Sequence, residues 1–196
     1  MDTCEYAGTA FTAPRSHPWT DAVGNPDCRY YDLTATPELI RQSLEDFQPW
    51  SAHAAIETFY RMLEEINQHG SLLESNDCAF TGPQENDQPA WPQALQCSGR
   101  VMVLFRDLKQ NTADGRVDAL AVQLHHALAP LDPDFSTGLI GTTLIPARYL
   151  QLPDGNQQLG WQLMISFWAW GDTVAETMAN LDRLFANLAR ALESVS

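Results

Sequence analysis

Lysine is almost absent from this chain, and positive charge is scarce overall. Among 196 residues, Lys and Arg together number 11, against 25 Asp and Glu, so the formal net charge is −14. Lys109 is the single lysine. Binding to nucleic acid or to an anionic membrane requires basic side chains that neutralise phosphates. The composition therefore argues against direct binding to either, whereas an acidic surface attracts cationic partners and speeds their association.

Long apolar runs and a secretory leader are also missing. No stretch approaches 18 consecutive apolar residues, and the most apolar run, 163–170, is too short to span a membrane. The first five residues, Met-Asp-Thr-Cys-Glu, contain neither the basic nor the apolar region of a signal peptide. We therefore expect a cytoplasmic protein.

Closely spaced cysteine pairs are absent. The four cysteines are Cys4, Cys28, Cys78 and Cys97, and no C-x-x-C occurs among them. Zinc sites usually show paired, closely spaced ligands, so we expect no metal site here. Reduced thiols are the default in the cytoplasm, although a Cys4–Cys28 bridge stays open.

Catalytic and cofactor motifs are missing as well. The chain lacks the phosphate loop, the dinucleotide-binding glycine pattern, H-E-x-x-H and G-x-S-x-G. His125 and His126 are adjacent, so on a regular helix they point about 100° apart and cannot chelate one ion. Asp132 and Asp134 flank a proline, which is more typical of a loop than of a cation site. We predict no catalytic residue and no cofactor.

The pattern along the chain indicates a single domain, 1–196, in four segments. Residues 1–36 contain several prolines and predict an irregular lead-in with a weak strand at 28–33. Residues 37–70 carry helix-start signals and apolar residues at helical spacing. Residues 71–99 contain no Lys or Arg but three prolines, and they predict a long acidic loop.

The second half, 100–196, predicts the order β-α-β-β-α. Asp154-Gly155 between two apolar runs is a hairpin signal. Thr173 and Glu176 form a capping box before a helix with heptad-like apolar spacing. The fold class is α+β, with an antiparallel sheet of about 3–4 strands and helices packed mainly on one face. The last helix either packs on this sheet or forms a coiled-coil seam, so the chain is a monomer or a homodimer.

Aromatic residues cluster in the last predicted strand. The period of two places Trp168 and Trp170 on one face and Phe167 on the other. If the tryptophan face is solvated, the pair marks a binding surface; if it is covered, the pair belongs to the core.

The overall acidity, the acidic stretch from Glu74 to Asp87 and the run Phe-Trp-Ala-Trp-Gly at 167–171 resemble the immunity proteins of bacterial polymorphic toxin systems. The resemblance implies a small acidic α+β protein that neutralises a basic effector, such as a nuclease, by filling its phosphate-binding groove. On this hypothesis carboxylates steer the encounter and tryptophans anchor the complex. The candidate partner-binding residues are Glu74, Asp77, Glu85, Asp87, Trp168 and Trp170.

Two other functions stay open at this point. An enzyme of unidentified type would use Asp, Glu or His as acid and base, in a pocket holding a buried carboxylate or imidazole with a shifted pKa. A structural or oligomerisation subunit would use the heptads of the C-terminal helix. The acidity is also consistent with solubility alone.

Overall fold

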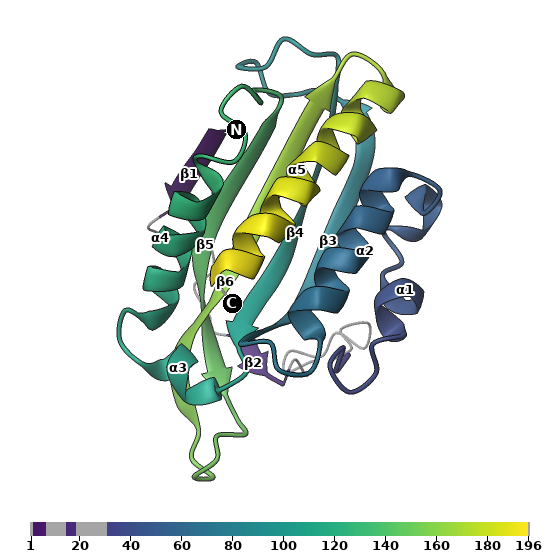
Figure 1. Ribbon diagram of the computed structural model, residues 1–196. Coiled ribbons are helices and arrows are strands. Elements are labelled where there is room, and N and C mark those ends of the chain that lie inside the picture. The colour runs from purple at the N-terminus through teal and green to yellow at the C-terminus, as the bar shows by residue number, and fades with distance from the viewer. Residues whose placement is uncertain (1, 7–14, 19–30, 196) are drawn as a thin grey trace.

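A computed structural model of the chain describes residues 2–6, 15–18 and 31–195 (Figure 1). The strands in these residues are β1 (Asp2–Tyr6), β2 (Arg15–His17), β3 (Leu73–Glu85), β4 (Leu95–Phe105), β5 (Gly138–Tyr149) and β6 (Gln158–Gly171). The helices are α1 (Leu39–Ser43), the 3-10 turn η1 (Gln48–Trp50), α2 (Ala54–Asn67), α3 (Leu108–Thr112), α4 (Arg116–Leu128) and α5 (Val174–Val195).

The strands form one mixed sheet in the order β1-β5-β6-β4-β3, and β2 also pairs with β5. The four long strands, β3 to β6, are antiparallel to their neighbours, whereas β1 and β2 run parallel to β5. The α+β class is thus confirmed. The prediction of a purely antiparallel sheet is wrong at one edge. There, two short strands from the predicted irregular lead-in, β1 and β2, pair in parallel with β5. Such short segments are placed by the strand they pair with rather than by their own propensity.

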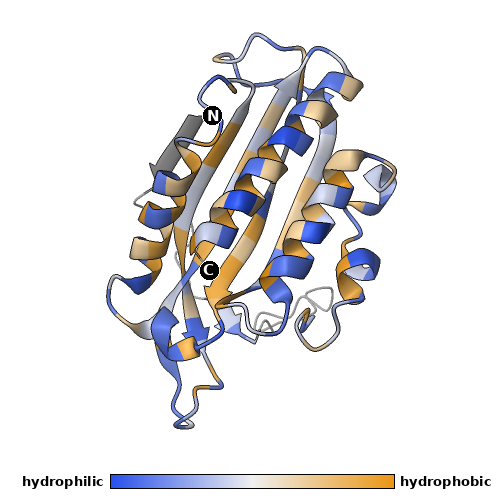
Figure 2. Cartoon of the chain, viewed as in Figure 1, coloured by the Kyte–Doolittle hydropathy of each residue, from blue (hydrophilic) through white to orange (hydrophobic). Residues whose placement is uncertain are grey.

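The helices α2, α4 and α5 lie side by side over one face of the sheet (Figure 1). Figure 2 shows polar residues along the outward side of α2 and α5. Between these helices and the sheet lies an aromatic cluster in which Phe59 of α2 stacks on Phe47 and also contacts Phe185 of α5. Phe167 of β6 meets Phe185 edge to face, which joins the sheet to the same cluster.

The C-terminal helix begins as predicted. The hydroxyl of Thr173 accepts a hydrogen bond from the Glu176 backbone N–H at 3.2 Å. The Glu176 carboxylate in turn accepts one from the Asp172 N–H at 2.9 Å. Five residues of the predicted stripe, Met178, Leu181, Phe185, Leu188 and Leu192, are buried in the core, whereas Val174 at its start is 42% exposed. The stripe therefore packs within the chain and does not form a free coiled-coil seam.

The β-α-β-β-α order of the second half is confirmed, with the short α3 added before α4. Gly115 and Gly155 both adopt positive φ angles, of 70° and 74°, at the two Asp-Gly turns. Tight turns in this left-handed region favour glycine, which explains why Asp154-Gly155 marks the predicted turn between β5 and β6.

The prediction of a long acidic loop at 71–99 is wrong. Most of this segment belongs to β3 and the start of β4, and the connection between them is only 86–94. The prolines suggested a loop, but β3 is an edge strand with irregular pairing between Thr81 and Gln84. Pro83 lies within that irregularity, and edge strands and bulges are where a sheet tolerates proline.

In the predicted weak strand at 28–33, residues 28–30 lie outside the described residues, and 31–33 form no strand. Cys28 also lies outside the described residues, so its bridge to Cys4 stays a prediction. In the part of the chain that is described, no helix combines the length and the apolar character needed to cross a membrane.

Candidate functional site

The six residues predicted to bind a partner do not form one surface patch. Glu74 and Glu85 lie near opposite ends of β3, and eleven steps along a strand span about 35 Å. Asp77 lies between them, and Asp87 follows in the loop. The structure therefore divides the predicted set into separate environments.

Glu85, Asp87 and Trp170 lie at the same end of the sheet. Glu85 pairs with Leu95, which in turn pairs with Gly171 beside Trp170. The Asp87 carboxylate accepts hydrogen bonds from the side-chain amides of Gln96 at 2.7 Å and Gln88 at 2.9 Å. The Gln96 bond first, and the Gln88 bond second, hold the pKa of Asp87 below its usual value. Both acids are exposed, so this end of the sheet presents negative charge.

Trp170 is not an exposed anchor. Its side chain is only 1% exposed because Trp91 covers it, with ring centroids 3.9 Å apart and planes 10° from parallel. Trp168 lies on the same face and is half-buried. The predicted division of faces is correct, since Phe167 lies in the core on the helix side. Of the two alternatives that the sequence left open for this face, the covered one holds for Trp170, because Trp91 lies over it from a loop that strand periodicity does not reveal. Trp170 is therefore no longer a candidate anchor.

Asn86 organises the loop that carries Trp91. Its side-chain amide donates hydrogen bonds to the carbonyls of Trp91 at 2.8 Å and Gln93 at 2.9 Å. Its side-chain oxygen accepts one from the Gln88 N–H at 2.9 Å. These local bonds, which are typical of Asn in turns, hold Trp91 over Trp170.

Asp77 forms an ion pair inside the chain. Its Oδ2 lies 3.3 Å from Nη2 of Arg100 on β4, and both side chains are partly exposed. Because Arg100 already balances its charge, Asp77 offers less attraction to an external cation than an unpaired carboxylate would.

Glu74 lies in a polar cluster rather than on an open surface. Its Oε1 is 3.5 Å from Nε2 of the buried His17, whose ring contacts Tyr149. Burial, and secondly the charge of Glu74, raise the pKa of Tyr149. The Tyr149 hydroxyl donates a hydrogen bond to the Trp161 carbonyl at 2.7 Å. Carboxylate and imidazole groups can exchange protons in principle, but this pair is closed in by neighbouring side chains.

Among the described side chains, the two free cysteines are Cys78 and Cys97, and both are unreactive near neutral pH. Burial raises the pKa of Cys97 to about 12, and burial raises the pKa of Cys78 further still. The thiolate is the reactive form of cysteine, so neither residue is suited to nucleophilic chemistry near neutral pH.

Of the histidine pair and the two aspartates singled out in the sequence, His125 and Asp132 have structural roles. His125 is buried with Nε2 2.8 Å from the Thr142 hydroxyl, whereas His126 is exposed. Asp132 accepts two hydrogen bonds from Arg183, at 2.6 and 2.7 Å. Within the described residues, no group of three His, Cys, Asp or Glu side chains could hold a metal ion.

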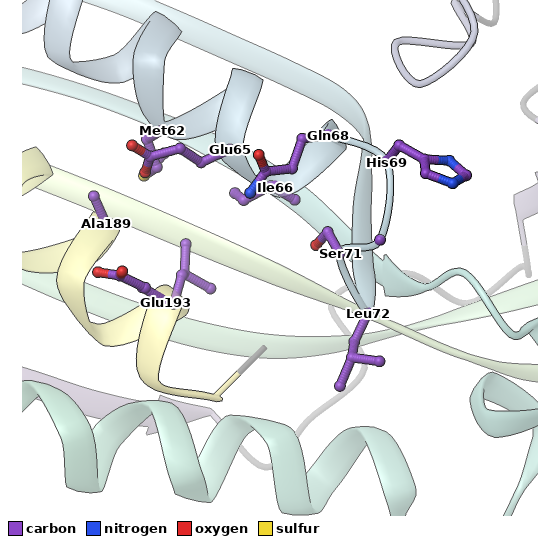
Figure 3. A pocket seen from close by; sticks show the side chains of 11 residues that line it. Met62, Glu65, Ile66, Gln68, His69, Ser71, Leu72, Ala189 and Glu193 are labelled. Carbon is purple, nitrogen blue, oxygen red and sulfur yellow. The ribbon is translucent and has the colours of Figure 1, made fainter.

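A pocket of about 630 Å³ lies where α2 and α5 both end (Figure 3). Its apolar floor is formed by Met62, Ile66 and Leu192, which are buried. Glu65 of α2 and Glu193 of α5 lie on its rim and are exposed. In Figure 3 both acids extend toward the same side of the pocket.

Most described basic side chains bind within the chain. Arg41 donates to Glu57 and to Glu64, at 2.7 Å each, and these bonds raise its pKa. The guanidinium of Arg106 donates to the carbonyls of Gln68 and Leu73. Together with the Asp77–Arg100 and Asp132–Arg183 pairs, these bonds engage much of the scarce positive charge. The exposed charged residues that line the pocket are Glu65 and Glu193, beside the exposed His69.

Sequence reasoning did not single out Glu65, Glu193 or Trp91. The two acids are far apart in the chain and meet only because α2 and α5 pack side by side. No signal in the sequence pairs them. Comparisons of the chain with protein-family models, with curated proteins and with solved structures found no match.

Proposed function

We propose that this chain is an acidic binding protein that neutralises a basic protein partner, as its resemblance to immunity proteins of bacterial toxin systems implies. The observation that carries the proposal is the distribution of charge. Much of the positive charge is used in internal ion pairs and hydrogen bonds, whereas Glu65 and Glu193 at one end, and Glu85 and Asp87 at the other, are exposed. Such carboxylates attract a cationic surface and orient it during encounter.

The features that would favour the other two functions are weaker. The pocket is lined by exposed carboxylates and an exposed His69, rather than by a buried acid or imidazole of the kind that an acid–base enzyme uses. The heptad residues of α5, which would have formed an oligomer seam, are occupied by packing against the chain's own sheet and α2.

The test is capture of the partner from a lysate of cells that naturally contain the chain. The tagged protein is incubated at about 50 mM and at about 500 mM salt, because screening weakens surface electrostatics over this range. We expect a stoichiometric protein with a net positive charge that is retained at low salt and released at high salt. A control bait of similar size and acidity identifies proteins that bind any acidic surface. Recovery of the chain alone, or of a partner without net positive charge, would contradict the proposal.

A further inference from the structure

We infer that the pocket at the ends of α2 and α5 anchors this partner by taking up one of its lysine or arginine side chains. The inference rests on the proposed function and adds the place and the chemistry of the contact. A volume of about 630 Å³ lies within the range of pockets that enclose small ligands, so it can accommodate a long side chain and its neighbouring backbone.

The lining suits a side chain that is apolar along its stem and charged at its tip. Met62, Ile66 and Leu192 provide an apolar floor, and Leu72, which is 51% exposed, extends it to the mouth. Lysine and arginine lay their methylene stems on such surfaces while the charged head reaches polar groups. The heads would meet Glu65 and Glu193, which extend from two different helices toward the same side of the pocket (Figure 3).

The helix ends strengthen the preference for a cation. Both α2 and α5 terminate at the pocket, and the C-terminus of a helix carries partial negative charge. The guanidinium of Arg106 already donates to the Gln68 carbonyl at the end of α2, at 2.8 Å. The last turn of α5 contains no basic residue, so its partial negative charge is not offset in the same way. The electrostatic complement of this pocket is therefore a positive group from outside.

A peptide probe tests the site without knowledge of the partner. The probe is a fluorescein-labelled peptide of alternating glycine with arginine or lysine, and its affinity is measured by fluorescence anisotropy at low salt. The double variant Glu65→Gln/Glu193→Gln removes the rim charges. Glu38→Gln/Glu45→Gln is the matched control, because it makes the same change in net charge at two exposed carboxylates that neither line the pocket nor belong to the proposed partner-binding residues. A third variant, Ala189→Phe, fills the pocket without changing the charge.

We expect the rim variant to weaken probe binding about tenfold or more, which corresponds to about 1.4 kcal/mol. The matched control should change the affinity less than about threefold, since distant exposed charges are screened. Ala189→Phe should weaken binding as the rim variant does, and circular dichroism checks that each variant is folded. Equal weakening by the two double variants would overturn the inference, because it would show diffuse attraction rather than a site.

The same variants separate this inference from the proposed function. If wild type and the rim variant capture the same basic partner equally well, the pocket is not the anchor, although the proposed function stands. If wild type captures no basic partner, the proposed function fails, and the probe then reports on the pocket alone. Loss of capture by the rim variant, with capture kept by the matched control, supports both.

Discussion

Replacing Phe59 with alanine is expected to lower the free energy of unfolding by about 3–5 kcal/mol. Phe59 is fully buried, and its ring stacks on Phe47 at 4.5 Å and packs against Phe185 at 4.8 Å. Removing it leaves a cavity where α2, α5 and the sheet meet. A domain of ordinary stability, about 5–15 kcal/mol, would lose a large part of it.

Urea unfolding followed by circular dichroism measures this change. The control is Leu159→Ala, because Leu159 is a large apolar residue that is 58% exposed. We expect the control to shift stability by no more than about 0.5 kcal/mol. A loss of under about 1 kcal/mol for Phe59→Ala would contradict the placement of Phe59 at the centre of the core.

Replacing Asn111 with alanine is expected to cost about 2–4 kcal/mol, for a different reason. The buried Asn111 side chain accepts a hydrogen bond from the Phe105 N–H at 2.9 Å and donates one to the Phe105 carbonyl at 2.8 Å. Phe105 lies beyond the last residue of β4 that pairs with β6. The Asn111 side chain therefore takes the place of β6 as the hydrogen-bonding partner of the Phe105 backbone. Each buried backbone group left without a partner costs about 1–3 kcal/mol.

Asn156→Ala is the matched control, because Asn156 is an exposed asparagine in the turn between β5 and β6. Its replacement should change stability by no more than about 0.5 kcal/mol. Thermal and urea unfolding of the two variants distinguish the roles. Equal stability of Asn111→Ala and Asn156→Ala would show that the two bonds to Phe105 do not contribute as the structure indicates.

The sequence predicted those parts of the fold that local signals specify. The capping residues Thr173 and Glu176, and the apolar spacing that follows them, place α5 correctly. The Asp154-Gly155 dipeptide locates the turn between β5 and β6. In each case the residues that determine the structure are neighbours in the chain, so their chemistry can be recognised without knowledge of the fold.

The parts that the sequence did not predict depend on distant contacts. Pro83 suggested a loop rather than a strand. It lies at an irregular position of the edge strand β3, where a proline without a backbone N–H is tolerated. Trp170 is buried because Trp91 lies over it from a loop held by Asn86. Glu65 and Glu193 meet only through the packing of two helices, so no spacing rule could join them.

The proposed attraction between this acidic chain and a basic protein is tested by the dependence of the association rate constant on ionic strength. The captured partner and the chain are mixed rapidly at ionic strengths from about 20 mM to about 500 mM, and tryptophan fluorescence follows binding. Electrostatic steering predicts that the association rate constant falls about tenfold or more over this range, while the dissociation rate constant changes less. An association rate constant that does not depend on ionic strength would contradict the account of this chain as an acidic binder of a basic protein.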